Sequence, residues 1–550
     1  MTLSYSQLKK AAFFCLLLPS LIFVIGFLKW YIGIPVALLL AVAYVFAIRD
    51  TGGEAHKTLT LSLPMLLLLL GAVTIWCFFG GLGNLWAQSE DWSARNAIFR
   101  DLIRFEWPVV YQAKNAALVY YIGYWLPAAL CGKGVLAVTG DLSHAFFIGN
   151  LALWAWSVIC VLTVLLLVLL LVRAAKRWQI CLAASVFILF SGLDLIGTLY
   201  NCISGPEWFP YHLEWWTEYQ FSSMTTALNW VFNQSVVAWM ATACFLLEKR
   251  VSNYAFLIVC SLSSSPLPAV GLGIYMVGYA VYLLWQAVQG GTLAAFLRDV
   301  LTVQNVIPTV TLLPIYFLYY KTNLAVNVGQ AATEVPPRDW LGIVLLLALT
   351  AGLLITVLIR KKRALPYPKR LVATLLTALV FCTAVMLARP TVHINYFLFL
   401  FFEAFIFLIL VFDDHENDVL FYLTWGIAAL CPLIHVGTAA DFCMRASIPV
   451  VFIIMIFCIR YLFDHKDLLL KKGGGIKRAA YLALIVVLLI GATTPAVEFI
   501  RSVRDFSFGQ RAFDWTYTMD QIFTGPLEGT DRNFIANAYR EHFFFSHLAK

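Results

Sequence analysis

The sequence predicts an all-α protein that crosses a lipid bilayer many times, and three observations support this fold class. The chain is 61% hydrophobic and 12% charged, about half the charged share of a soluble domain. Apolar runs of roughly 17 to 25 residues, long enough to cross the hydrocarbon core as helices, recur from Ala11 to Phe499. Lysine and arginine gather in short clusters between these runs. We therefore expect about 13 to 15 membrane-spanning helices within residues 1–499, followed by a short tail, 500–550.

The basic clusters give the predicted helices an orientation. Short loops rich in lysine and arginine lie on the cytoplasmic side of a membrane, and the clearest here are near 173–177, 249–250, 360–370 and 466–478. The net charge of +8 therefore reports topology and not a nucleic-acid partner, because no basic domain is formed. Threading helices between the clusters places the N-terminus in the cytoplasm and the tail outside. The predicted spans are 11–28, 31–48, 59–79, 144–172, 180–197, 226–247, 253–265, 266–288, 301–320, 339–360, 371–389, 396–412, 419–438, 443–463 and 479–499.

Residues 116–138 are apolar enough to span, but a crossing here would carry the basic cluster at 173–177 to the outside. The tyrosines and tryptophan of this segment suit the headgroup level of a membrane. We therefore expect an interfacial or re-entrant element within a large first external loop, 80–143.

That loop concentrates charge in a chain otherwise poor in it. Glu90 and Asp91 follow a glycine-rich span end and precede an expected helix, 93–105, and Asp101 and Glu106 come soon after. A carboxylate at the membrane surface could act as a general base toward a hydroxyl, or bind a metal ion. The alternative is that Asp91 caps the helix and its neighbours form ordinary ion pairs.

A second candidate is Asp194, near the outer end of the span 180–197. An ionisable group at that depth is costly unless it is paired or lines a wet cavity. Asp194 is therefore expected to belong to a functional site, and the alternative is a structural pair.

The loop that follows contains His212, Glu214 and Trp215, and the next apolar helix contains Asn233 and Gln234. Aromatic rings beside carboxylates and amides suit a sugar, whose C–H faces stack on rings while its hydroxyls need hydrogen bonds. The alternative for the aromatic residues is an interfacial belt.

A third cluster comprises Arg389 and His393, then Asp441 and Arg445 at the outer start of a membrane helix. A guanidinium near the positive end of a helix favours a phosphate at headgroup depth. The alternative is that Asp441, four residues earlier, neutralises Arg445.

Taken with these residues, the sequence resembles the GT-C class of membrane glycosyltransferases. The resemblance rests on the many spans, the acidic pair Glu90–Asp91 in the first external loop, and an external arginine. The strings YYIGYWLPAAL, FSGLDLIG, HLEWW, WVFNQS and DFCMRASIP are similar to those of bacterial membrane proteins grouped with that class. The resemblance covers most of residues 59–463. The acidic loop follows the third span here, whereas in the class it usually follows the first, and the tail is shorter than many members' soluble domains.

The resemblance implies an inverting enzyme that moves a hexosyl or pentosyl group from a polyprenyl-phosphate carrier to a cell-envelope glycan or lipid on the outer membrane face. Asp91 would deprotonate the acceptor hydroxyl, with Glu90 and Asp194 in the catalytic set, and Arg445 or Arg389 would hold the leaving phosphate. A divalent metal ion on the three carboxylates is compatible with this scheme but not required. The expected partners are the lipid-linked sugar, its acceptor and membrane lipids, and no nucleic acid.

Two other functions remain open: a transporter or flippase of lipid-linked saccharides, and a polymerase or ligase of surface glycans. The polar candidates lie toward the exterior and no internal pseudo-symmetry is evident, which favours a transferase over a transporter. The single N-x-S/T sequon, at Asn233, lies inside a span and favours a bacterial plasma membrane. For one site, we expect Asp91, Asp194 and Arg445 to lie within roughly 15 Å of each other.

Overall fold

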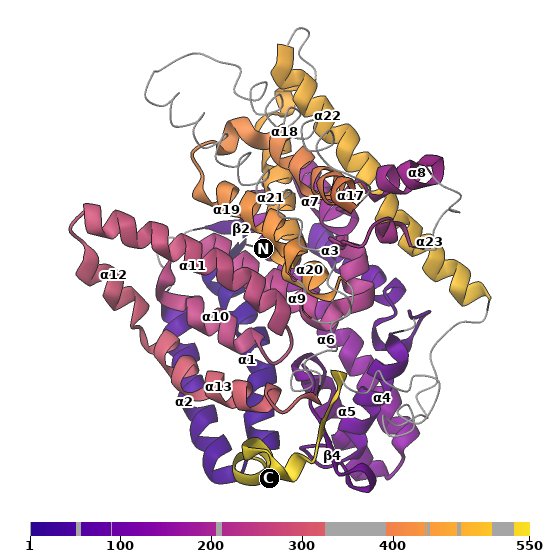
Figure 1. Cartoon of the computed structure of the whole chain (residues 1–550), viewed down its shortest axis with the longest axis vertical. Helices are drawn as coiled ribbons and strands as arrows, with labels where there is room; N and C mark the ends of the chain where they lie inside the picture. The colour runs from indigo at the N-terminus through magenta and orange to yellow at the C-terminus, as the bar shows by residue number, and fades with distance from the viewer. Residues whose placement is uncertain are drawn as a thin grey trace. The chain divides into compact units, whose positions relative to one another are not determined.

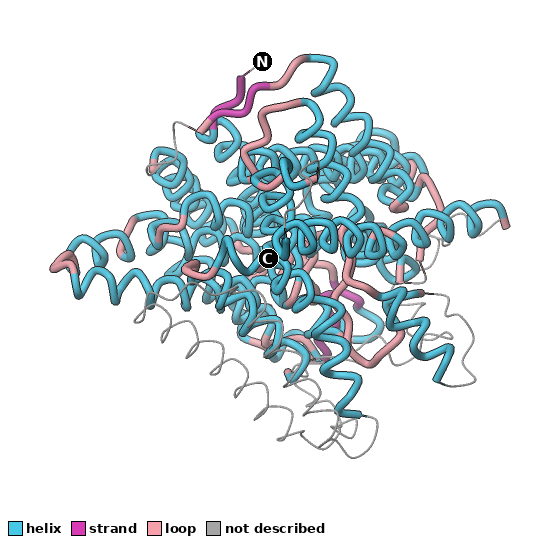
Figure 2. Tube along the Cα trace, turned by 90° about the horizontal axis from the view of Figure 1, so that it is seen from above, coloured by secondary structure: helices cyan, strands magenta, loops and turns pink. Residues whose placement is uncertain are grey.

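The computed structural model of the chain is almost entirely helical (Figure 2). It describes residues 2–50, 57–89, 91–204, 212–324, 392–434, 436, 440–469, 475–508 and 533–550. The chain forms two compact units: unit 1 comprises Met1–Ile180, Thr226–Ala331 and Phe499–Lys550, and unit 2 comprises Cys181–Thr225 and Ala332–Glu498. The all-α fold is confirmed, and the predicted spans 339–360 and 371–389 lie outside the described residues.

Most helices of unit 1 follow the predicted spans. The helices of this unit are α1 (Tyr5–Phe27), α2 (Trp30–Arg49), α3 (Leu63–Phe79), α4 (Trp92–Arg104), α5 (Leu126–Thr139), α6 (Leu142–Leu171), α10 (Tyr254–Ser261), α11 (Pro266–Gln289), α12 (Leu293–Val300) and α13 (Val303–Tyr320), with most of α9 (Met224–Glu248). Helices α4, α5 and α12 lie in segments predicted not to cross the membrane, and α10 is shorter than the predicted span 253–265. Helices α1, α2 and α13 pack side by side (Figure 1).

Local chemistry fixes where several of these helices begin and end. Ser4 and Gln7 form a reciprocal capping box at the start of α1. Helix α5 ends at Gly140, whose φ of +68° suits a residue without a side chain. The next residue, Asp141, begins α6 by accepting the backbone N–H groups of Ser143 and His144. Two adjacent residues thus build the turn of the α5–α6 hairpin.

The surface and the helix lengths both suit a bilayer. Among the described residues, seven helices are long and apolar enough to cross a membrane, and nine if two bent pairs, α7 (Arg177–Leu189) with α8 (Asp194–Ser204) and α12 with α13, are each one span. Large apolar side chains such as Leu38 of α2 and Val277 of α11 are exposed on the protein surface, at 64% and 65%. Lipid would cover such side chains, whereas a soluble protein rarely exposes them in quantity. The chain is therefore a multi-pass membrane protein.

Two predicted segments differ from simple spans. Residues 116–138 form a strand, β4 (Ala116–Leu118), a short turn, and the 14-residue helix α5, which at 1.5 Å per residue is about 21 Å long and too short for a full crossing. The predicted span 180–197 is not one straight helix, because it breaks into α7 and α8 with a bend of 41°. The break contains Gly192, and Asp194 begins the second helix.

Connections that the sequence places on one side of the membrane also lie together in unit 1. Strand β4 pairs with β3 (Val110–Tyr111) and, from the tail, with β5 (Ile535–Asn537). The Asn323 side chain, just after α13, donates to the carbonyls of Val119 and Asn533 at 2.8 and 3.0 Å. All of these belong to loops predicted to be external. Which of the two faces is cytoplasmic remains a prediction.

The segments predicted to be cytoplasmic form a second group in unit 1. Strands β1 (Thr2–Ser4) and β2 (Thr58–Thr60) pair beside the start of α1. The ammonium of Lys9 binds the carboxylate of Glu248, at the end of α9, and donates to the carbonyl of Asp50. Tyr5 and Asn253 donate hydrogen bonds to the Glu248 carboxylate. We call these four residues, Lys9, Glu248, Tyr5 and Asn253, the cationic clamp.

Unit 2 is built around a second helix cluster. Its remaining helices are α17 (Val392–Leu400), α18 (Ile406–His415), α19 (Val419–Leu430), α20 (Asp441–Ala446), α21 (Ile448–Asp464) and α22 (Gly475–Gly491). Helix α18 packs against α21 and α22, and α22 contacts α8. A π-helical turn, Phe401–Phe405, joins α17 to α18 and carries Glu403 into the interior. Helix α23 (Thr493–Ser507) contributes residues to both units.

Candidate functional site

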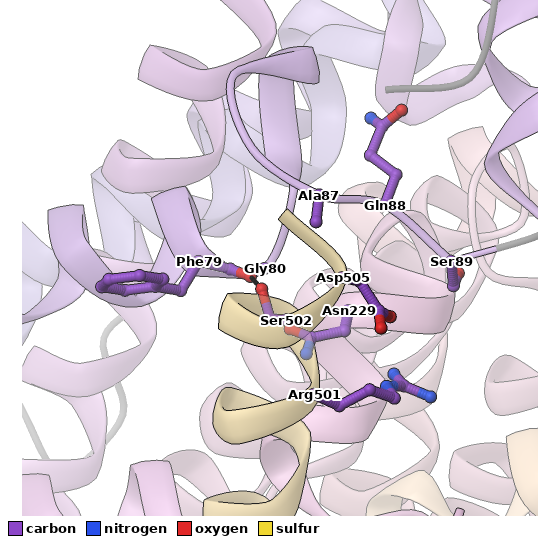
Figure 3. Close-up of a pocket in the computed structure, with 9 residues that line it drawn as sticks. All are labelled: Phe79, Gly80, Ala87, Gln88, Ser89, Asn229, Arg501, Ser502 and Asp505. Carbon is purple, nitrogen blue, oxygen red and sulfur yellow. Dashed lines mark hydrogen bonds between the residues drawn. The ribbon is translucent and has the colours of Figure 1, made fainter. Parts of the chain in front are cut away.

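A small polar pocket lies in unit 1 beside the acidic segment of the first predicted external loop. Its walls come from three stretches: the end of α3 and the segment after it, the N-terminal part of α9, and α23 (Figure 3). The lining residues are Phe79, Gly80, Ala87, Gln88, Ser89, Asn229, Arg501, Ser502 and Asp505. The space suits a water molecule or the end of a polar group.

The glycines after α3 let the chain fold back to form this pocket. Gly81 has a φ of +74°, which favours glycine, and a Cβ there would lie 2.6 Å from the Ala87 carbonyl oxygen. The side-chain amide of Gln88 donates to the Gly81 carbonyl at 2.9 Å and accepts from Asn96 at 2.8 Å. The run GGLGN is therefore a structural requirement of the pocket wall.

Helix α23 closes the opposite wall. The Ser502 hydroxyl donates to the Phe79 carbonyl at 2.8 Å, and the rings of Trp86 and Phe506 stack with centroids 3.6 Å apart. The Arg501 guanidinium lies 5.1 Å from the centroid of the Trp230 ring. Arg501, Ser502 and Asp505 extend from α23 into the lining (Figure 3).

Two uncharged polar atoms of the lining are buried without a hydrogen-bond partner in the described part of the chain: Asn229 Oδ1 and Ser89 Oγ. The Asn229 side chain belongs to a residue that is 7% exposed, and its backbone carbonyl accepts from Trp92 Nε1 at 3.0 Å. Buried polar atoms without partners are costly. Together with one cation and one carboxylate, they suit a ligand that offers hydroxyl or phosphate groups.

Asp91 follows two residues after Ser89. Its side chain makes no capping hydrogen bond, so the alternative of a helix cap is not realised. Its carboxylate binds Arg95 at 3.0 Å while the side chain stays 52% exposed. Glu90 lies outside the described residues.

The other charges of this loop have structural partners. Asp101 is fully buried and accepts from the Tyr111 hydroxyl at 2.9 Å. The ammonium of Lys133 donates to the Phe105 carbonyl at 2.5 Å, just beyond the last turn of α4, where a positive charge offsets the helix dipole. Burial lowers the pKa of Lys133.

The second predicted candidate, Asp194, lies in unit 2 and is 2% exposed. Its carboxylate accepts hydrogen bonds from the hydroxyls of Ser191 and Thr494 at 2.8 and 2.9 Å, and it also interacts with Glu403. The sequence interpretation missed Glu403, a lone acid in the apolar run FLFLFFEAFIFL. An isolated carboxyl group in such a run was the signal available.

His212 and Glu214 belong to the same buried region of unit 2. Glu214 accepts from the Gln220 amide at 2.7 Å and from the Ser223 backbone N–H at 2.8 Å. His212 lies 3.1 Å from Glu498 and 3.9 Å from Glu214. The Trp215 ring packs edge-on against the His212 ring, with centroids 4.9 Å apart, although its side chain is 53% exposed.

The remaining predicted residues divide among several places. Asp441 and Arg445 form an ion pair of 2.9 Å in unit 2, which is the structural alternative. Asn233 and Gln234 are buried in α9, in unit 1, and within the described chain Asn233 Nδ2 and Gln234 Oε1 lack hydrogen-bond partners. Arg389 and the side chain of His393 lie outside the described residues.

The structure leaves one predicted grouping open. Asp91 belongs to unit 1, whereas Asp194 and Arg445 belong to unit 2, so their common site remains a prediction. Within the described residues, no group of three or more histidine, cysteine, aspartate or glutamate side chains could hold a metal ion.

Comparisons with protein-family models, curated proteins and solved structures found no match.

Proposed function

We propose that this chain is a membrane glycosyltransferase that takes a hexosyl or pentosyl group from a polyprenyl phosphate and transfers it to a hydroxyl of a cell-envelope glycan or lipid. The observation that carries the proposal is the polar pocket of unit 1, which opens beside the segment Ser89–Asp91 in a multi-pass membrane chain. Its unpartnered Ser89 and Asn229 oxygens suit sugar hydroxyls.

In this reaction the acceptor oxygen attacks the anomeric carbon, and the bond from that carbon to the phosphate oxygen breaks. Asp91 takes the proton from the acceptor hydroxyl, and inversion follows from attack on the face opposite the leaving group. The polyprenyl phosphate leaves with its negative charge next to a guanidinium. Arg501, which lines the pocket, is the proposed phosphate partner within unit 1.

The test is turnover in proteoliposomes supplied with polyprenyl phosphates that carry a labelled hexose or pentose, and with envelope lipids and glycans as acceptors. Asp91→Asn keeps the side-chain shape but removes most of its basicity, so turnover should fall by about 10²- to 10⁴-fold. Arg501→Gln should in addition weaken donor binding.

Two matched variants keep this test specific. Arg95→Gln removes the ion-pair partner of Asp91, and an equal loss there would mean that Asp91 acts only by pairing. Glu541→Gln, an exposed carboxylate of the tail, should leave turnover unchanged. Near-normal transfer by Asp91→Asn would contradict the proposal.

A flippase for lipid-linked saccharides is the second candidate, because unit 2 has buried carboxyl groups at the break between α7 and α8. Broken membrane helices with polar groups at the break are common in transporters. A fluorescent lipid-linked sugar in the same proteoliposomes separates the two functions. Chemical quenching from outside would exceed half of the signal for a flippase, without any glycosylated product.

A further inference from the structure

The break between α7 and α8 in unit 2 is occupied by a carboxyl group from another helix. A Cβ on Gly192 would lie 1.8 Å from Glu403 Oε2, so the Glu403 carboxyl fills the space that a side chain at position 192 would need. The Leu193 backbone N–H donates to the Phe402 carbonyl at 3.2 Å and ties the break to the turn that carries Glu403.

Glu403 reaches this position because its helix is locally widened. It lies in the middle of the π-helical turn Phe401–Phe405 and is 3% exposed. Such turns insert one extra residue into an α-helix and occur often at functional sites. The turn directs a carboxyl group inward from a surrounding sequence of phenylalanine and leucine.

The partner of Glu403 is a second carboxyl group. Asp194 and Glu403 interact with each other, and Asp194 also has the hydroxyls of Ser191 and Thr494. Neither Glu403 oxygen has a well-formed hydrogen bond among the described residues, although the Trp216 indole lies within interaction range. The buried Glu403 carboxyl can therefore form a hydrogen bond with the Asp194 carboxyl.

The charges around the pair do not offset two ionised carboxylates. The titratable neighbours in the described chain are Glu214 and the Cys443 thiol, which interact with Glu403, and His212, which interacts with Asp194 and lies 3.1 Å from Glu498. No lysine or arginine of the described chain interacts with Asp194 or Glu403. Two adjacent carboxylates that are buried away from bulk solvent repel each other and lose much of their hydration, so one proton between them is strongly favoured.

We propose that Asp194 and Glu403 form a proton-binding site that holds one proton between two carboxyl groups inside unit 2. The proton moves from an oxygen of one group to an oxygen of the other, so one O–H bond breaks as another forms and the net charge of the pair stays at minus one. His212, the basic side chain of the described chain that interacts with Asp194, is the exchange partner that this proposal assigns to the site. The observations that support this site all come from unit 2 and do not depend on the proposed transferase activity.

Infrared spectroscopy of the purified full-length protein tests this proposal. A protonated carboxyl group has a C=O stretching band separate from the carboxylate bands. We expect such a band to persist at about pH 7, where exposed acids are ionised. Glu403→Gln should abolish it, whereas Asp194→Asn should shift its position, because the hydrogen-bonding neighbour changes.

Glu218→Gln, an exposed carboxyl in the same unit, is the matched control and should leave the band unchanged. Selective carbon-13 labelling of glutamate carboxyls moves the band only if the proton resides partly on a glutamate, and loss of the shifted band in labelled Glu403→Gln assigns it to Glu403. The absence of a protonated band at about pH 7, or its survival in Glu403→Gln, would overturn the proposal.

Discussion

The cationic clamp of unit 1 and the acid pair of unit 2, Asp194 with Glu403, are both buried, but among the described residues only the clamp contains a cation that balances its carboxylate. In the clamp, Glu248 has an ammonium partner in Lys9 and receives hydrogen bonds from Tyr5 and Asn253 at 2.7 Å each. In the acid pair, Asp194 accepts hydrogen bonds from two hydroxyls, and Asp194 and Glu403 interact with each other. The clamp is complete as a charged structure, whereas the acid pair is complete only with an added proton. A buried charge therefore indicates structure when its partners balance it and chemistry when they do not.

The largest expected effect is on the clamp. Lys9→Met leaves the Glu248 carboxylate buried without a cation, and we expect a loss of about 3 to 5 kcal/mol in the free energy of unfolding. Unfolding in mixed micelles measures it. Lys10→Met, an exposed neighbour, should have little effect, and the double variant Lys9→Met with Glu248→Gln should recover part of the loss. A single variant as stable as the native chain would remove the distinction between the two regions.

The acid pair should respond much less to the equivalent change. Glu403→Gln replaces a protonated carboxyl with a neutral amide of nearly the same shape, so stability at about pH 7 should change by at most about 1 kcal/mol. Glu248→Gln, in the clamp, should cost several times more, because Lys9 then lacks its counter-charge. Equal losses from the two glutamine variants would show that Glu403 is ionised.

The smallest effect is expected at the surface edge of the clamp. Arg250 binds Asp50 at 3.1 Å and Asp299 at 3.2 Å, but its side chain is 38% exposed. Water and salt screen such pairs, so Arg250→Gln should cost about 0.2 to 0.5 kcal/mol and the difference should vanish in high salt. Arg298→Gln, an exposed arginine of α12, is the control. If Arg250→Gln lowered the free energy of unfolding as much as Lys9→Met, burial would not determine how much an ion pair contributes to stability.

Hydrophobic runs were sufficient to predict most helices, because a membrane helix must satisfy its backbone hydrogen bonds internally. They could not predict that the Glu403 carboxyl, more than two hundred residues away in the chain, occupies the break at Gly192. The pairing of Asp441 with Arg445 was visible from their four-residue spacing. Arg501 and Ser502 were missed because the last span was predicted to end at 499, whereas α23 continues to Ser507.

The candidate site was predictable to a similar, partial degree. The segment Ser89–Asp91 was singled out by its charge, and its pocket lies in the same unit. The partners in that pocket, Asn229 and Arg501, come from distant helices, and nothing in their local sequence marks them as neighbours. Tertiary packing, which one-dimensional patterns do not encode, decided which polar groups meet.

The three-stranded sheet β3–β4–β5 also constrains the order in which the protein can be assembled. Strand β4 lies in the middle, and its second partner, β5, is separated from it by more than four hundred residues of chain. During synthesis the backbone groups of Ala116–Leu118 that face β5 must wait until residue 537 has left the ribosome. Throughout the insertion of the intervening helices, this edge of β4 lacks its β5 partner, so the sheet is completed only after those helices have been made.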